Sequence, residues 1–205
     1  MIIEGRTGFG DVAASEGVIA QARFGKTFEL MTAHAHARHY DAVRRGNVFC
    51  ATNQAIIALS VNSATATGLI LNNPVGSGKN LVLLELMVAL GTAPAGVSVL
   101  ALVGSKGPAA SVTHTTPMTT GFTNALLGGG NASVALVDTA ATIPTPATFR
   151  SVPGGVVAAS SISTPFIKDN IDGALVLAPG TVISLQAYTT AISVIAGLTW
   201  EEVPV

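Results

Sequence analysis

The stretch Asn72–Asn80 reads Asn-Asn-Pro-Val-Gly-Ser-Gly-Lys-Asn and places two glycines and a lysine between apolar runs. Such a loop could bind phosphate, because glycine lets backbone N–H groups close on the anion while the lysine reaches it. A phosphate loop needs another glycine five residues before Gly78, and Ser or Thr after the lysine. Asn73 and Asn80 occupy these positions. We therefore interpret the stretch as a glycine-rich hairpin turn between two antiparallel strands.

Three histidines, His34, His36 and His39, form the second group with chemical potential. Residues two apart on a strand share a face, so His34 and His36 could bind one metal ion. In a trimer, the two histidines of each chain could surround a threefold axis. No cysteine or carboxylate joins them at ligand spacing. We favour a solvated segment and expect no cofactor, and whether His34 and His36 bind a metal stays open.

The remaining reactive side chains show no catalytic spacing. Glu201 and Glu202 are adjacent and would point to opposite faces of a strand, which suits solvent contact. Asp169 and Asp172 flank a polar turn, and Cys50 has no base nearby in the sequence. The Gly-x-Ser-x-Gly elbow of many hydrolases is also missing from the sequence. We therefore expect a protein that is not an enzyme and has no catalytic residues.

The composition indicates a surface that other subunits cover. Charged residues make up 10% of the 205-residue chain, against about 25% in typical soluble domains. Apolar residues make up 49% but aromatic residues only 5%. A body with so few charges is poorly solvated unless neighbouring subunits bury its surface. The net charge of −1 gives no reason to expect a nucleic-acid or membrane partner.

Charge and proline divide the chain into two parts. Eleven of the 21 charged residues lie in residues 1–45, and all ten prolines follow position 73. We expect residues 1–45 to form an extended arm and residues 46–205 to form the folded body. The arm lacks the features of a signal peptide, so we expect synthesis and assembly in the cytoplasm. Arg38, Arg44 and Arg45 near the end of the arm could contact carboxylates of a partner.

The sequence of residues 46–205 predicts strands throughout. Side chains alternate between two faces over 96–104, 181–189 and 193–203, as in strands with one buried face. The run 80–90 is long enough for a helix, but we interpret it as a buried strand. Turn residues separate about eight to ten such segments. We predict an all-β fold, a jelly-roll-like antiparallel β-sandwich with an extended N-terminal arm, in which Trp200 anchors the core or an interface.

Three stretches carry a resemblance to a known group. They are His39–Ser60 (HYDAVRRGNVFCATNQAIIALS), Gly68–Leu86 (GLILNNPVGSGKNLVLLEL) and Ala178–Val205 (APGTVISLQAYTTAISVIAGLTWEEVPV). Together they resemble virion structural proteins of tailed bacteriophages. The resemblance implies a homotrimeric capsid cement (decoration) protein on the virion surface, whose arm contacts the major capsid protein and neighbouring decoration subunits.

Two other functions stay open. A trimeric head or tail fibre, or receptor-binding module, is the first alternative, although one Trp and two Tyr provide little aromatic surface for binding a sugar. A small hydrolase with a jelly-roll body is the second, and it would have to use residues such as Lys79 and His114.

Overall fold

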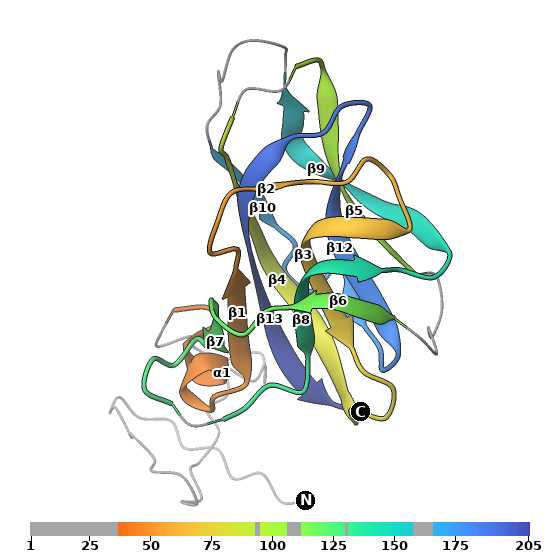
Figure 1. Cartoon of the computed structure of the whole chain (residues 1–205). Coiled ribbons are helices and arrows are strands. Elements are labelled where there is room, and N and C mark those ends of the chain that lie inside the picture. The colour runs from red at the N-terminus through yellow and green to blue at the C-terminus, as the bar shows by residue number, and fades with distance from the viewer. Residues whose placement is uncertain (1–36, 93–94, 106–111, 130, 158–165) are drawn as a thin grey trace, which may run out of the picture. The chain divides into compact units, whose positions relative to one another are not determined.

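The chain is shown as a computed structural model that describes residues 37–92, 95–105, 112–129, 131–157 and 166–205 (Figure 1). Its residues divide into two compact units, Met1–Asp41 and Ala42–Val205. The division lies four residues before the predicted border at 45/46. One short helix, α1 (Tyr40–Arg44), crosses the division. His34 and His36 lie outside the described residues.

The first layer of the second unit is a seven-stranded sheet in which all pairs are antiparallel. Its long strands are β4 and β13, and β13 lies centrally between β4 and β1. In spatial order the main path is β10 (Phe166–Asn170), β4 (Lys79–Leu90), β13 (Ser193–Pro204), β1 (Val48–Thr52) and β7 (Phe122–Asn124). Two short strands lie off this path, β11 (Val176–Leu177) beside β4 and β2 (Ile57–Ala58) beside β13.

The second layer is a six-stranded antiparallel sheet, and the two sheets pack as a sandwich. Its spatial order is β6 (Thr113–Pro117), β8 (Leu136–Thr142), β3 (Thr65–Asn73), β12 (Thr181–Tyr188), β5 (Ser98–Ser105) and β9 (Pro146–Val157). The predicted all-β sandwich is confirmed, and the run 80–90 is a strand as expected. Strands β2, β7 and β11 are too short to be predicted from the alternation of apolar and polar residues.

The inner faces of the sheets form the main core, as the alternation predicted. Strand β12 contributes Ile183, Leu185 and Ala187, and β5 contributes Leu100 and Leu102. Strand β13 contributes every second residue, namely Val194, Ala196, Leu198 and Trp200. Full burial of one large apolar side chain stabilises the fold by about 1.5–3 kcal/mol. The shared burial of these side chains therefore holds the two layers together.

The turn at 74–78 is not the predicted hairpin. Strands β3 and β4, which it joins, belong to different sheets and do not pair with each other. The buried side chain of Asn73 organises this crossing, because its Nδ2 donates to the carbonyls of Lys79 and Leu177, each at 2.8 Å. Ser77 donates to Asn73 Oδ1 at 2.6 Å. Asn73 thus hydrogen bonds to backbone groups of two neighbouring strands. These bonds let the chain cross from one sheet to the other, whereas a hairpin would keep it within one sheet.

An ion pair joins the edges of the two sheets. Arg150 on β9 donates from Nε and from one terminal nitrogen to the two carboxylate oxygens of Asp169 on β10, at 2.7 and 2.8 Å. Asp169 is buried within a strand, so only Asp172 lies in the expected polar turn. The hydrogen bond to Asp169 raises the pKa of the Arg150 guanidinium above its ordinary value. A two-point contact of this kind fixes both distance and orientation between the edges.

The two partners of this pair should not contribute equally to stability. Arg150→Met leaves a buried carboxylate without a cation and should cost about 3 kcal/mol. Asp169→Asn leaves an arginine whose side chain is 33% exposed and can turn to water, so the loss should be about 1 kcal/mol. Urea unfolding monitored by Trp200 fluorescence measures both losses. Equal losses, or a larger loss for Asp169→Asn, would contradict this account of the pair.

Candidate functional site

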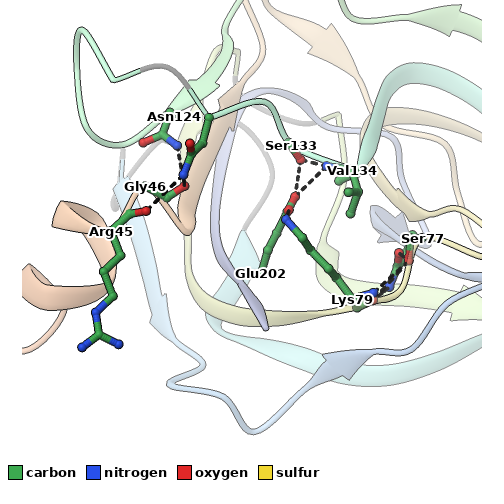
Figure 2. Close-up of polar contacts among 11 residues, drawn as sticks. Arg45, Gly46, Ser77, Lys79, Asn124, Ser133, Val134 and Glu202 are labelled. Atoms are coloured by element: carbon green, nitrogen blue, oxygen red, sulfur yellow. Dashed lines mark hydrogen bonds and ion pairs between the residues drawn. The ribbon is translucent and has the colours of Figure 1, made fainter. Parts of the chain in front are cut away.

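Arg44 and Arg45 lie exposed at the end of α1. In Figure 2 the guanidinium of Arg45 extends away from the neighbouring strands, while its backbone carbonyl accepts a hydrogen bond. Neither arginine forms an ion pair with any residue that the structure describes. Arg38, the third arginine of the predicted contact, is exposed in the other compact unit. Two of the three predicted residues thus lie side by side on the sandwich unit.

Gly46 fixes the end of α1 in place. Its N–H donates to Val43 at 2.8 Å and the next N–H, of Asn47, donates to Ala42 at 3.0 Å. These two bonds form a Schellman motif, which needs a left-handed residue after the helix, and Gly46 has φ +72°. The helix end is then held against β7, because Asn124 Nδ2 donates to the Gly46 carbonyl at 2.7 Å.

Asn131 attaches the same helix end to the segment that follows β7. Its Nδ2 lies 3.0 Å from the Arg45 carbonyl and 3.3 Å from the Gly46 carbonyl. The packing is close, since a Cβ at position 46 would lie 2.5 Å from that nitrogen. The backbone that carries Arg44 and Arg45 is therefore positioned by two asparagine side chains.

A pocket of about 310 Å³ lies beside this helix end. Phe49 of β1 and Phe122 of β7 provide its aromatic surface, and the polar side chains come from β7 and the segment after it. The full lining is Phe49, Phe122, Thr123, Asn124, Gly129, Asn131, Ala132 and Ser133. Phe49 is buried and Phe122 is half-buried, so the accessible wall of the pocket is mostly polar.

Two exposed leucines stand next to the pocket. The exposed fraction is 38% for Leu126 and 83% for Leu127. Their turn is defined by internal bonds, because the Leu126 N–H donates to Asn124 Oδ1 at 2.8 Å and the Gly129 N–H to the Leu126 carbonyl at 2.7 Å. Gly128 adopts φ +83°. The backbone therefore holds Leu127 at the top of a turn, exposed to solvent.

Trp200 lies in the core behind the pocket. It is 0% exposed and stacks on Phe49 and Phe122, with ring centroids 6.2 and 5.7 Å apart. Of the two places expected for it, the structure shows the core, and no part of its side chain reaches the surface to anchor an interface. Its indole N–H is buried without a hydrogen-bond partner. As the single tryptophan of the chain, it is a natural optical reporter for the pocket.

Lys79, the lysine of the glycine-rich turn, binds a carboxylate of its own chain. Its Nζ lies 2.9 Å from Glu202 Oε2, and the Glu202 side chain is fully buried (Figure 2). The other carboxylate oxygen accepts from the Ser133 hydroxyl and, at 3.0 Å, from the Val134 N–H. The expectation of a solvent-facing Glu202 is thus wrong, because β13 continues its inward alternation from Trp200 to Glu202. The lysine has a structural partner where a phosphate loop would hold an anion.

His114 and Asp138 form a pair that the sequence did not reveal. His114 Nδ1 lies 2.7 Å from Asp138 Oδ2, and the carboxylate is fully buried while the imidazole side chain is 30% exposed. The second carboxylate oxygen has no hydrogen-bond partner. No serine or cysteine hydrogen bonds to this imidazole among the described residues. The pair therefore has the base and the orienting acid of a hydrolytic site, without a nucleophile on the imidazole.

Other candidate chemistry is also accounted for. Cys50 is half-buried, its thiol lies 3.7 Å from the Thr123 carbonyl, and burial raises its pKa, so the reactive thiolate is disfavoured. Within the described ranges, no three His, Cys, Asp or Glu side chains gather as metal ligands. The same ranges contain no helix with the length and apolar content needed to cross a membrane.

Comparisons with known protein families, with curated proteins and with solved structures find no match to this chain. The candidate site therefore rests on the geometry of α1, β7 and the segment 124–133. The residues of this site share no sequence motif. Gly46 after an Arg-Arg pair could have indicated a helix end, and the Leu-Leu-Gly run at 126–128 could have indicated an exposed turn.

Gly46→Ala should reveal how tightly the helix end is packed, and Gly76→Ala is its matched control. Gly76 has φ +77° with no atom near its missing Cβ, so Ala there should cost only the left-handed backbone, about 1–2 kcal/mol. Gly46→Ala should cost at least about 1 kcal/mol more, because the methyl group meets Asn131. Urea unfolding compares the two variants. In an Asn131→Ala background, the extra cost of Gly46→Ala over Gly76→Ala should disappear. Equal costs of the two substitutions in the wild-type background would contradict the close packing of Gly46 against Asn131.

Proposed function

We propose that this chain is a structural protein of a tailed-phage particle, which binds the outside of the capsid as a homotrimer and stabilises the shell. The resemblance of three of its segments to virion structural proteins suggests the setting. The sandwich fold and the distribution of charge support a role in assembly. The observation that carries the proposal is a row of apolar side chains on the outer face of the seven-stranded sheet.

That face is built by strand register. Phe166, Ala89 and Ile195 lie opposite one another on β10, β4 and β13, pointing away from the core. Phe166 is 51% exposed and Ile195 is 36% exposed. Next to this row, Met87 also faces outward on β4, and the ion pair of Lys168 with Glu85 borders it. An apolar centre with a charged rim is typical of a subunit interface.

The few charges of the body are mostly used within the chain. Nine of the ten charged residues in 46–205 lie in the described ranges, and seven of these nine pair with a side chain of the same unit. They are Lys79 with Glu202, Arg150 with Asp169, Lys168 with Glu85, and Asp138 with His114. Little charge is left to solvate the outer surface, so burial by sister subunits would remove an otherwise aggregation-prone face.

Shell stabilisation then follows from mass action. A protein that binds only the assembled shell lowers the free energy of that state and raises the cost of opening it. A trimer presents each contact three times, so weak individual contacts can give firm attachment. The exposed Arg44 and Arg45 are suited to carboxylates on the capsid, and Arg38 is a third candidate in the N-terminal unit.

A head or tail fibre, or receptor-binding module, is the second proposal, since it would need the same trimeric packing. It differs in the expected contact, which would be a host surface, and in requiring no contact with the shell. A small hydrolase would require the His114–Asp138 pair to serve catalysis.

The apolar face gives a direct test of the trimer. Phe166→Glu and Ile195→Glu each place a charge where sister subunits would meet, and desolvating it should convert the trimer to monomer. Sedimentation velocity measures the change. Val97→Glu is the control, because Val97 is 54% exposed in the loop before β5. Wild-type protein that sediments as a monomer at all concentrations, or variants that remain trimeric, would contradict the proposed interface.

Adding the purified chain back to particles tests the function itself. Particles from which the chain has been stripped should release DNA at a lower temperature than intact particles, and the wild-type chain should restore the higher temperature. A dye that fluoresces on DNA measures the release. The monomeric Ile195→Glu variant should raise the release temperature only slightly, because the variant loses the avidity of three contacts. No shift on addition of saturating wild-type chain would contradict shell stabilisation.

A further inference from the structure

We propose that the Leu-Leu-Gly turn at 126–128, the leucine turn, is the second half of the subunit interface and packs on the outer face of the seven-stranded sheet in a neighbouring copy of this chain. The receiving surface is the row of Phe166, Ala89 and Ile195. Turn and row both belong to the unit Ala42–Val205. The inference rests on the proposed function and deepens it, because it names the two surfaces that meet in the homotrimer.

Threefold symmetry requires two different surfaces on each subunit. A surface that packs against its own copy lies on a twofold axis, and such a contact closes a dimer. In a ring of three, each subunit presents one surface to the copy before it and another surface to the copy after it. The outer-face row supplies only one of these two surfaces. The proposed trimer therefore needs a second apolar surface elsewhere on the sandwich.

The leucine turn provides that second surface. The exposed fraction of Leu127 is 83%, the highest among the large apolar side chains that the structure describes, and the adjacent Leu126 is 38% exposed. No charged residue lies between Lys106 and Asp138 in the sequence, so the turn has no charge of its own to solvate it. Burial in a subunit contact would remove both leucines from water.

The backbone presents the two leucines before any partner binds. The Leu126 N–H donates to Asn124 Oδ1 at 2.8 Å, and the Gly129 N–H donates to the Leu126 carbonyl at 2.7 Å. The side chain of Asn124 is buried, and its Nδ2 donates to the Gly46 carbonyl at 2.7 Å, which fastens the turn to the body. A surface that is ordered before binding loses less entropy when a partner docks.

The receiving row favours a neutral apolar occupant such as this turn. Phe166 is 51% exposed and Ile195 is 36% exposed, on either side of Ala89. The neighbouring charges, Lys168 and Glu85, already pair with each other at 2.6 Å. A charged segment would bring an unpaired charge against the apolar row, where its desolvation would oppose binding. The uncharged leucine turn of a second copy covers the row without that cost.

Engineered disulfides in the full-length chain test the contact. Cys50→Ser removes the one native thiol, and Leu127→Cys is then combined in turn with Phe166→Cys, Ala89→Cys or Ile195→Cys. Oxidation should join subunits into covalent dimers and trimers in at least one combination, because a disulfide forms where two Cα atoms lie within about 7 Å. Each cysteine alone should form no covalent dimer, since the two surfaces differ. Non-reducing gel electrophoresis at low protein concentration measures the products.

Leu127→Ser measures what the turn contributes to the trimer. The substitution should raise the concentration at which the trimer dissociates by at least about tenfold, because the burial of a leucine is lost at every contact. Sedimentation velocity measures the dissociation. Val97 is 54% exposed away from both surfaces, so Val97→Ser should dissociate like wild type and Val97→Cys should not cross-link with Leu127→Cys.

The outcomes separate this contact from the proposed function. A wild-type trimer in which no combination cross-links, or in which Ile195→Cys alone cross-links to itself, would overturn the contact and leave the trimer in place. Covalent chains of more than three subunits would overturn the closed ring, and a wild-type monomer would overturn trimer and contact together. If cross-linking follows the prediction but the wild-type chain does not raise the release temperature of stripped particles, the shell function is wrong and the contact stands.

Discussion

The buried carboxylate of Glu202 is the interaction on which the other features depend. It lies at the inward face of β13, the central strand of one sheet, and binds Lys79 at the start of β4. Its second oxygen holds Ser133 and Val134, which lead directly into β8 of the other sheet. A buried charge is tolerated only when such partners satisfy it. One side chain thus closes an end of the sandwich and positions the wall of the pocket.

The pairing of charged residues within the chain also determines the character of the outer surface. The Arg150–Asp169 ion pair joins the edges of the two layers, while the Lys79–Glu202 pair lies within one sheet, and Glu202 reaches the other layer through its hydrogen bonds to Ser133 and Val134. The outer face of β4 and β10 combines apolar residues with the Lys168–Glu85 pair, and β6 is exposed and mostly neutral and polar. A fold stabilised in this way fits the proposed burial against copies of itself, where further charged groups would cost desolvation energy.

Local alternation predicted the strands of this fold but could not assign them to sheets. The alternation over 181–189 predicted one buried face because period two follows from strand geometry alone, and Ile183, Leu185 and Ala187 lie on that face in the core. The turn at 74–78 was misread because a hairpin and a crossing between layers use the same turn residues, and only the bonds of Asn73 distinguish them. Glu201 and Glu202 point to opposite faces as expected, but the expectation of solvent contact failed for Glu202, because its spacing from Trp200 places it on the inward face. The His114–Asp138 pair depends on the irregular register of β6 against β8, which no sequence pattern encodes.

The candidate site was predictable only in its charged part. Arg44 and Arg45 stood out as a basic pair before a glycine, while the pocket required three distant segments, around Phe49, Phe122 and Asn131, to meet. The most direct test of the central claim is the copy number of this chain relative to the major shell protein in purified particles, measured by quantitative mass spectrometry. A structural protein of the shell surface should be present in a number comparable to that of the shell subunits. A handful of copies per particle would contradict the cement role and favour a fibre, and complete absence would contradict a role in the virion.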